Sequence, residues 1–175
     1  MLGLSVNRDP QVMGIVNVTP DSFSDGGQFD STDSAIAHGR QLAAEGADIV
    51  DIGGESTRPG AQAVPTRQEI ERVVPVISTL AREGITVSVD TSKPEVMEAA
   101  VDAGASMVND IYALRRPGAL EVAAQLEVPI GLMHMQGTPA TMQNAPRYDD
   151  VGAEIEQFLK TRVEVCLDAG IDRTR

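Results

Sequence analysis

The sequence has a single cysteine, no tryptophan and few basic residues. Cys166 cannot form a disulfide within the chain, which fits a reducing compartment. It lies in an apolar helical pattern, so we interpret it as a packed thiol. The chain carries 14 Lys and Arg residues against 26 Asp and Glu, a formal net charge of −12 at pH 7. Since nucleic-acid-binding proteins normally carry a basic patch, this balance argues against a nucleic-acid partner.

Long apolar segments are also missing. No run approaches the roughly 20 apolar residues that span a bilayer, so we expect no membrane partner. The N-terminal residues reach Arg8 and Asp9 too soon for a signal peptide. With 42% hydrophobic residues, the 175 residues can still bury one sizeable core. We therefore expect a single domain over residues 1–175, located in the cytoplasm.

Strand-like and helix-like patterns alternate along the chain, which is typical of α/β proteins with a parallel sheet. Short apolar strands are predicted at about 11–16, 48–52, 85–89, 106–108 and 129–133. Helices are predicted at about 33–45, from 66 to the glycine at 84, from 92 to the glycine at 104, at 119–126 and at 149–169. The pattern predicts five complete βα units without an internal domain boundary.

Two of the predicted helices begin with the spacing of a capping box. Thr66 precedes Glu69 by three residues, and Ser92 precedes Glu95 in the same way. In a capping box the hydroxyl and the carboxylate satisfy two free backbone amides at the start of the helix. We therefore expect both pairs to cap their own helices.

Two predicted strands each continue into a long polar loop, and each strand and loop together form one segment. Residues 12–27 read Val-Met-Gly-Ile-Val-Asn-Val-Thr-Pro-Asp-Ser-Phe-Ser-Asp-Gly-Gly, and residues 46–60 read Gly-Ala-Asp-Ile-Val-Asp-Ile-Gly-Gly-Glu-Ser-Thr-Arg-Pro-Gly. A strand-to-helix connection normally takes about two to six residues, so loops of this length are expected to carry function. In this order and at this separation, the two segments resemble the signature segments of the dihydropteroate synthase family.

The resemblance covers essentially the whole chain and implies a TIM (β/α)8-barrel fold. A complete barrel takes about 250 residues, so the chain is expected to form about the first five βα units, a partial pterin-binding domain. The implied activity is a transferase reaction of folate biosynthesis, the step that sulfonamides target. It condenses 6-hydroxymethyl-7,8-dihydropterin diphosphate with para-aminobenzoate to give 7,8-dihydropteroate and diphosphate by dissociative displacement.

The family also has site residues and dimer-forming helices in later segments that this sequence does not contain. The resemblance therefore implies a homodimer for a complete family member, whereas the usual interface helices are absent here. We expect the 175-residue chain alone to have negligible synthase activity. Condensation by the purified chain at a rate typical of the complete enzyme would contradict this expectation.

Polar residues close five successive predicted strands. They are Asn17, Asp51, Asp90, Asn109 and His134. Catalytic groups of a barrel gather at the carboxyl ends of its strands, so we expect a shared pocket. Carboxylates and primary amides can pair with the guanidine-like edge of a pterin ring. Taken singly, each residue could simply begin a loop, and Asp90 could cap the helix that follows.

The resemblance implies roles for particular residues. The substrate-binding residues that we predict are Asp51, Thr57, Asp90, Asn109 and Met133. Among these, Asp90 and Asn109 match pterin-binding positions of the family. Asn17 matches the position that supports Mg²⁺ and the diphosphate. Its amide oxygen is a hard ligand, which suits this cation. An Asx-turn at the strand exit is the alternative for Asn17.

Three residues of the two loops are predicted to act in catalysis. Thr57 matches a residue beside the pterin and the aminobenzoate, and Arg58 matches a neighbour of the diphosphate. Phe23 is expected to form an aromatic wall of the aminobenzoate pocket in a loop that excludes water from a cationic intermediate. Arg58 could instead be a solvated surface residue, and Phe23 could pack into the core.

Two other interpretations stay open. A folate-binding methyltransferase shares the pterin pocket and the barrel, but it would lack the Thr-Pro-Asp-Ser-Phe-Ser-Asp-Gly-Gly loop at 19–27. A non-catalytic pterin-binding fragment, or an assembly partner that needs a second chain, would retain ligand without turnover.

Overall fold

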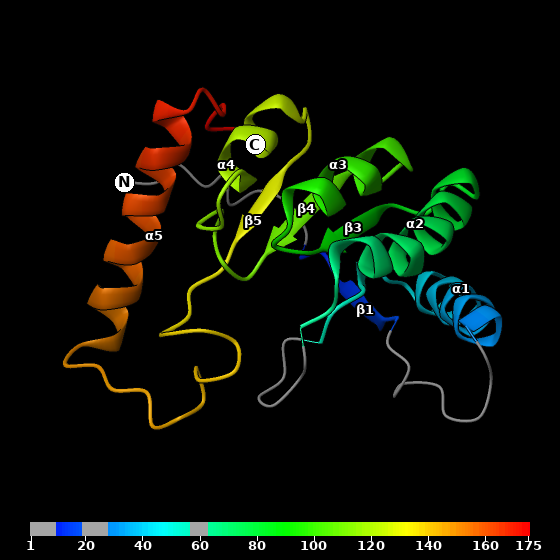
Figure 1. Cartoon of the computed structure of the whole chain (residues 1–175), viewed down its shortest axis with the longest axis horizontal. Coiled ribbons are helices and arrows are strands. Elements are labelled where there is room, and N and C mark those ends of the chain that lie inside the picture. Colours follow the sequence, from blue (N-terminus) through cyan, green and yellow to red (C-terminus); the bar gives the residue numbers. More distant parts are fainter. Residues whose placement is uncertain (1–9, 19–27, 57–62) are drawn as a thin grey trace.

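The computed structural model describes residues 10–18, 28–56 and 63–175. Within these residues, strands and helices alternate (Figure 1). The strands are β1 (Met13–Asn17), β2 (Ile49–Gly53), β3 (Val87–Asp90), β4 (Met107–Asp110) and β5 (Ile130–Leu132). The helices are α1 (Gln28–Ala44), α2 (Thr66–Arg82), α3 (Pro94–Asp102), α4 (Ala119–Gln125) and α5 (Val151–Asp168). The five predicted βα units are thus confirmed, although α1 begins five residues earlier than predicted.

The strands form one parallel sheet in the order β1-β2-β3-β4-β5. Parallel neighbours need a crossover connection, and here a helix supplies each one. Figure 1 shows α1, α2, α3 and α4 following one another along the same side of the sheet. Strands that pair in sequence order, each followed by a helix on the same side, have the arrangement found in a (β/α)8 barrel.

The core lies between the sheet and this row of helices. Branched side chains from neighbouring strands share one register row and are almost fully buried. They are Val16, Ile52, Val89 and Val108. From the other side, α2 contributes Val73, Ile77 and Leu80, which are also inaccessible to solvent. Full burial of such a side chain contributes about 1.5–3 kcal/mol, so this layer fixes the position of the strands.

Both capping-box predictions are wrong. The N-cap residue of α2 is Pro65 and that of α3 is Lys93, and neither helix has a side-chain hydrogen bond at its cap. Glu69 is instead buried, with its carboxylate turned toward residues of the segment before α3. A tertiary partner has replaced the local one. In α5 a side chain does cap its helix, as expected for an acidic N-cap, because Asp150 accepts a hydrogen bond from the amide of Ala153.

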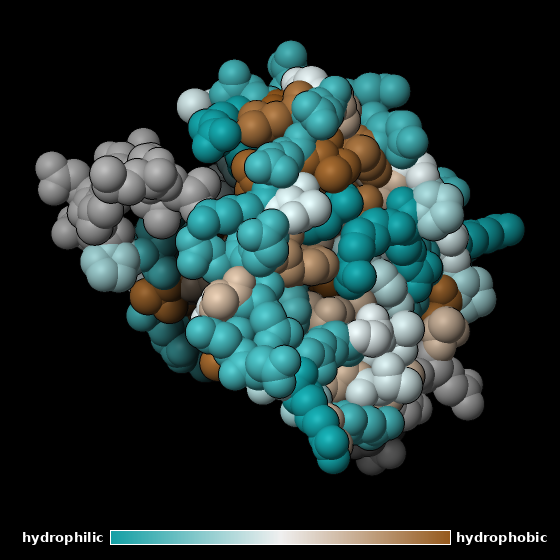
Figure 2. Space-filling model, turned by 90° about the vertical axis from the view of Figure 1, so that its left-hand side faces the viewer, coloured by the Kyte–Doolittle hydropathy of each residue, from teal (hydrophilic) through white to brown (hydrophobic). Residues whose placement is uncertain are grey.

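Helix α5 stands beside α4 and is largely exposed. Figure 2 looks onto this side and shows a mostly hydrophilic surface with a hydrophobic patch near its upper end. Cys166 is the buried residue of α5, and burial raises the pKa of its thiol, so the packed thiol is confirmed. The guanidinium of Arg162 donates to the carbonyl oxygens of Ala113 and Leu114 and so ties α5 to the segment after β4. None of the described helices is long and apolar enough to cross a membrane.

Candidate functional site at the strand ends

One register row of the sheet brings three predicted site residues to the same face. Asn17 pairs with Gly53, Gly53 with Asp90, and Asp90 with Asn109. Paired residues of neighbouring parallel strands point to the same side of the sheet, because side chains alternate with a period of two. This row lies at the carboxyl ends of the strands. The side chains of Asn17, Asp90 and Asn109 therefore converge there, opposite the helix-covered face.

Asp51 lies on the same face, one layer deeper. It precedes Gly53 by two residues, and its side chain is only 3% exposed. The amide nitrogen Nδ2 of Asn109 donates to Oδ2 of Asp51 at 3.1 Å, which links the two layers. Within the part of the chain that the structure describes, Oδ1 of Asp51 is buried without a hydrogen-bond partner. A buried polar atom without a partner costs about 1–3 kcal/mol, so this oxygen is an acceptor available to a ligand.

A second buried polar atom without a partner lies beside Asp51. Ser88 pairs with Asp51 in the register, and its Oγ also finds no hydrogen-bond partner among the described residues. Ser88 was not among the site residues predicted from the sequence. The signal that could have found it is the strand period of two, because Ser88 precedes Asp90 by two residues and therefore lies on its face. Together the two groups form a polar floor beneath the strand-end row.

Asp90 has an unusual proton affinity. Burial raises the pKa of its carboxyl to about 7, and the negative charge of Asp51 adds to this effect. Smaller contributions in the same direction come from Asp110, Glu69 and Glu55. Carboxylates gathered in a site of low dielectric disfavour one another's ionised form. Asp90 is thus a carboxyl that a positively polarised ligand would stabilise strongly.

Gly53, the last residue of β2, and Gly54, which follows it, differ in the space that surrounds their Cα atoms. A Cβ atom on Gly54 would lie 2.8 Å from Cγ1 of Val73 and 2.9 Å from Cγ of Glu69, so the chain can approach α2 closely only without a side chain. A Cβ on Gly53 would lie 3.5 Å from Oδ1 of Asn17 and 3.7 Å from Oδ2 of Asp90, which are ordinary contacts. Gly53 leaves open the space between these two oxygens.

Two residues after β5 lie differently from the strand-end row. Met133 is half-buried, and its backbone amide donates to the carbonyl oxygen of Asp110 at 3.3 Å. The ring of His134 packs against Phe158 with 4.9 Å between ring centroids, and against Tyr148 at 5.9 Å. His134 therefore belongs to an aromatic group beside α5 and does not extend the register row, contrary to its predicted place among five converging strand ends.

The predicted catalytic residues Phe23, Thr57 and Arg58 lie outside the described residues. Their roles stay predictions. The described residues that flank Thr57 and Arg58 in the sequence, up to Ser56 on one side and from Ala63 on the other, can be located.

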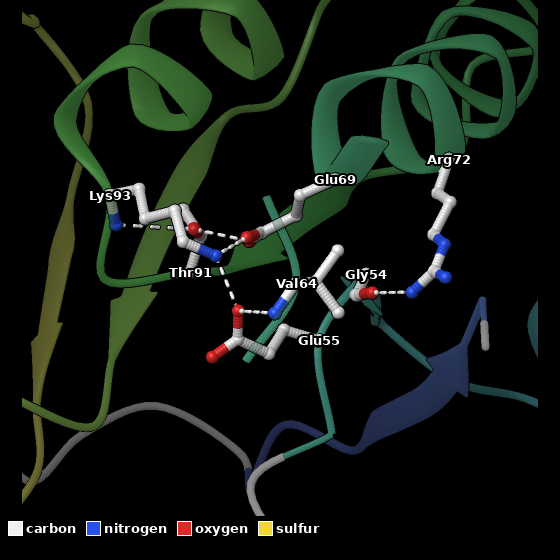
Figure 3. Close-up of polar contacts among 7 residues, drawn as sticks. All are labelled: Gly54, Glu55, Val64, Glu69, Arg72, Thr91 and Lys93. Carbon is white, nitrogen blue, oxygen red and sulfur yellow. Dashed lines mark hydrogen bonds and ion pairs between the residues drawn. The ribbon is translucent and has the colours of Figure 1, made fainter. Parts of the chain in front are cut away.

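A charged cluster that the sequence analysis missed lies next to these flanks (Figure 3). The ammonium of Lys93 contacts both Oε2 of Glu55 and Oε2 of Glu69. The second carboxylate oxygen of Glu69 accepts a hydrogen bond from Oγ1 of Thr91 at 2.6 Å. We call these four residues the Lys93 cluster. A small hollow lined in part by Glu55, Glu69, Thr91 and Asp90 places the cluster beside the strand-end row.

The donor set at the strand ends is compatible with Mg²⁺. The described residues contain no group of three or more His, Cys, Asp or Glu side chains arranged to hold a metal. However, Mg²⁺ commonly takes only one or two protein oxygens together with waters and substrate phosphates. Oδ1 of Asn17 and Oδ2 of Asp90, on either side of Gly53, are hard oxygens of this kind.

A parallel α/β sheet with amides and carboxylates converging at its strand ends is the architecture of barrel enzymes, whose active sites lie at the carboxyl ends of the strands. The family described as "pterin binding enzyme" matches residues 13–175, so the chain belongs to the pterin-binding enzyme family. The predicted resemblance to dihydropteroate synthases is also confirmed. The dihydropteroate synthase of Escherichia coli K12 is 51% identical over 167 residues, which cover 95% of this chain and 59% of that protein.

Solved structures agree with this assignment. A dihydropteroate synthase from Xanthomonas albilineans with 4-aminobenzoic acid matches with a TM-score of 0.87 and 57% identity, over 98% of this chain and 61% of that one. The same enzyme in complex with 7,8-dihydropteroate matches with a TM-score of 0.82 and 53% identity, over 97% and 59%. The predicted (β/α)8-barrel class is therefore confirmed. The chain spans about three-fifths of the length of these relatives, 59% to 61%.

Proposed function

We propose that this chain provides the pterin-binding part of a dihydropteroate synthase. The reaction would condense 6-hydroxymethyl-7,8-dihydropterin diphosphate with para-aminobenzoate to 7,8-dihydropteroate and diphosphate. The observation that carries the proposal is the register row that puts Asn17, Asp90 and Asn109 on one face, above the buried and unpartnered Oδ1 of Asp51. Relatives whose structures contain 4-aminobenzoic acid or 7,8-dihydropteroate support it.

The strand-end side chains suit the pterin ring. The ring has a guanidine-like edge with hydrogen-bond donors side by side, and an ionised Asp90 can accept two of them. Asn109 donates through Nδ2 to Asp51, which leaves its Oδ1 available to accept a hydrogen bond from the ligand. The bound ring would therefore meet an oriented array of acceptors. Because the ring donates to Asp90, its binding would favour the ionised carboxylate over the protonated form.

The condensation itself needs little proton transfer from the protein. Diphosphate departs with the electron pair of the C–O bond, the arylamine nitrogen then bonds to the methylene carbon, and that nitrogen loses a proton. In our proposal Arg58 contacts the diphosphate, Thr57 lies beside pterin and aminobenzoate, and Phe23 forms the wall of the aminobenzoate pocket. Met133 completes the predicted substrate contacts.

We further propose that Asn17 supports a Mg²⁺ ion beside the diphosphate. Mg²⁺ would neutralise the negative charge that develops on the leaving group. Asn17 is an exposed residue at the strand end, which suits contact with a hydrated cation. Cytoplasmic residence, homodimer formation and sulfonamide sensitivity remain predictions that accompany the same proposal.

The test combines binding and turnover. The chain is titrated calorimetrically with 7,8-dihydropteroate, as wild type and as Asp90→Asn, with Asp102→Asn at the exposed end of α3 as a chemically matched control. We expect Asp90→Asn to weaken binding by about 100-fold, because charge-assisted hydrogen bonds contribute about 1.5–3 kcal/mol each. Asp102→Asn should bind like the wild type. Equal affinities for all three proteins would overturn the proposed pterin site.

Turnover is assayed with pterin diphosphate and labelled para-aminobenzoate, on this chain and on any longer polypeptide that contains it. Formation of 7,8-dihydropteroate by either protein supports the synthase reaction. Retention of 7,8-dihydropteroate without product formation by either protein would favour a non-catalytic pterin-binding role instead.

A further inference from the structure

We infer that Lys93 is a positioning residue that fixes both ends of the segment between β2 and α2. Glu55, near the start of this segment, belongs to the Lys93 cluster, and Val64, near its end, is hydrogen-bonded to Glu55. Thr57 and Arg58 lie between them in the sequence. The catalytic consequence of this inference rests on the proposed function, whereas the structural role of Lys93 does not.

One carboxylate oxygen joins the two ends. Oε2 of Glu55 accepts a hydrogen bond from the backbone amide of Val64 at 3.0 Å, and the same oxygen contacts the ammonium of Lys93. Figure 3 shows Lys93 and Val64 meeting at this oxygen. The start of the segment is held a second time, because Nη1 of Arg72 donates to the carbonyl oxygen of Gly54 at 2.8 Å.

Lys93 in turn is tied to two helices. It precedes Pro94, the first residue of α3, and its ammonium also contacts Glu69 in the first turn of α2. The hydroxyl of Thr91 binds the other oxygen of Glu69 and accepts a hydrogen bond from the amide of Lys93 at 3.3 Å. The ends of the segment are thus held against the N-terminal ends of both α2 and α3.

The burial of these charges indicates a role other than general stability. The side chain of Lys93 is 10% exposed and that of Glu69 is 1% exposed. Replacing a buried ion pair by apolar residues is often neutral or stabilising, so such a pair is weak evidence for a stabilising purpose. In this protein the ion pair holds the ammonium of Lys93 in one position, where it contacts Glu55. An apolar residue at this place could not make that contact.

The position of the cluster separates two parts of the proposed site. The pterin ring would be held by Asp51, Asp90 and Asn109, which belong to strands and do not depend on Lys93. Under the proposed function the diphosphate is contacted by Arg58, whose place in the sequence is between Glu55 and Val64. Loss of Lys93 should therefore weaken binding of the diphosphate ester and leave binding of the free pterin alcohol almost unchanged.

The experiment compares two variants that differ only at Lys93. Glu69→Gln retains the contact between Lys93 and Glu55, and its side chain can still pair with Thr91 and Lys93. The double variant Lys93→Met/Glu69→Gln removes the ammonium while keeping the wild-type charge of the cluster, since one cation and one anion disappear together. Neither variant places two buried carboxylates beside each other without a cation, so both are expected to fold.

Hydrogen exchange of backbone amides gives the first measurement. We expect exchange at Val64 to be at least about tenfold faster in the double variant than in Glu69→Gln, as the carboxylate of Glu55 loses its fixed position. The amide of Val50, which donates to the carbonyl oxygen of Thr86, is the internal control and should exchange equally in both. Equal exchange at Val64 in the two variants would overturn the positioning role, whether or not any ligand binds.

Ligand affinity gives the second measurement. We expect the double variant to bind 6-hydroxymethyl-7,8-dihydropterin diphosphate about tenfold more weakly than Glu69→Gln does, a loss of about 1.4 kcal/mol. Affinity for 6-hydroxymethyl-7,8-dihydropterin should change less than about twofold. An equal loss for both ligands would overturn the separation of roles. Faster exchange at Val64 in a protein that binds neither ligand would uphold the positioning of the segment and reject the proposed function.

Discussion

The two polar groups next to the ends of β2 and β3 differ in how their charges are satisfied. In the Lys93 cluster, two carboxylates share one buried ammonium, and Thr91 binds a further carboxylate oxygen. The strand-end group consists of the strand-end row and the polar floor beneath it. Within the described residues, Asp51 and Asp90 form no such ion pair, and the buried Oδ1 of Asp51 has no hydrogen-bond partner. Satisfied charges hold chain segments in place, whereas unsatisfied ones are available to a ligand. We therefore assign a supporting role to the Lys93 cluster and a ligand-binding role to the strand-end group.

The pKa of Asp90 records the same contrast. The pKa of its carboxyl is raised to about 7 by burial and by surrounding carboxylates, including Glu55 and Glu69 of the Lys93 cluster. A single ammonium does not neutralise two carboxylates, so the cluster retains negative charge that reaches Asp90. The supporting group therefore also prepares the binding group for a ligand that donates hydrogen bonds.

The largest effect should follow from breaking the satisfied group. Lys93→Met leaves Glu55 and Glu69 facing each other without their cation, and we expect the free energy of unfolding to fall by about 3–5 kcal/mol, as is found when one partner of a buried pair is removed. Urea denaturation at pH 7 measures this change. Combining Lys93→Met with Glu69→Gln should restore part of the lost stability.

The matched control is the ion pair between Arg40 and Glu83, whose side chains are 53% and 37% exposed. Arg40→Met should leave the free energy of unfolding nearly unchanged, because exposed ion pairs contribute little. If Lys93→Met were as mild as Arg40→Met, the Lys93 cluster would not be the satisfied, supporting group that we describe.

A smaller effect of opposite sign is expected in the strand-end group. Because the pKa of Asp90 rises from 3.8 to about 7 on folding, the folded state binds a proton more tightly than the unfolded state. Stability therefore falls as pH rises from about 4 to 7 and then levels off. Asp90→Asn removes this penalty, so we expect the variant to be more stable than the wild type at pH 8, by up to about 4 kcal/mol for a shift of this size.

Near pH 4 the wild-type carboxyl is protonated in the folded state, so Asp90→Asn should be nearly neutral there. Urea denaturation of both proteins at pH 4, 6 and 8 measures the difference. A stability difference that does not change with pH would show that Asp90 is ionised at no cost in the folded protein. The strand-end group would then not be the unsatisfied one.

The contrast also explains which features could be predicted from the sequence. Asp90 and Asn109 were found because each closes a strand, and strand ends are visible in the alternation of apolar and polar residues. Their convergence depends on the register of the sheet, which that alternation predicts only in general terms. Ser88 lies on the same face, as the strand period of two predicts, but nothing in the sequence indicates that its hydroxyl is buried without a hydrogen-bond partner among the described residues.

The Lys93 cluster could not be predicted, for a physical reason. The spacing of Thr66 and Glu69 suggests a local hydrogen-bonding partner for Glu69, and the capping-box prediction relied on it. The ammonium of Lys93 offers a stronger, charged partner in a buried place, 24 residues away from Glu69. Sequence spacing shows only the local partner, because the distant one comes near through the fold. In this protein Glu69 binds the distant partner and not the local one.

The smallest effect should come from two glycines that flank the strand-end group. A Cβ on Gly131 would lie 2.8 Å from Oδ1 of Asn109 and 3.2 Å from Cε of Met107, so Gly131→Ala must displace the Asn109 side chain. Displacement weakens the bond from Asn109 to Asp51 and leaves that buried carboxylate without its partner. We expect a loss of about 1 kcal/mol in the free energy of unfolding, at the lower end of the cost of overpacking.

Gly53→Ala is the matched change on the other side of Asp90. The new methyl group would make only ordinary contacts, 3.5 Å from Asn17 and 3.7 Å from Asp90, and alanine restricts the unfolded chain more than glycine does. We therefore expect Gly53→Ala to be neutral or stabilising by up to about 0.5 kcal/mol. Thermal and urea denaturation distinguish the two variants. Equal stability would mean that the hydrogen bond between Asn109 and Asp51 does not set the geometry of the strand-end group, since only Gly131→Ala disturbs that bond.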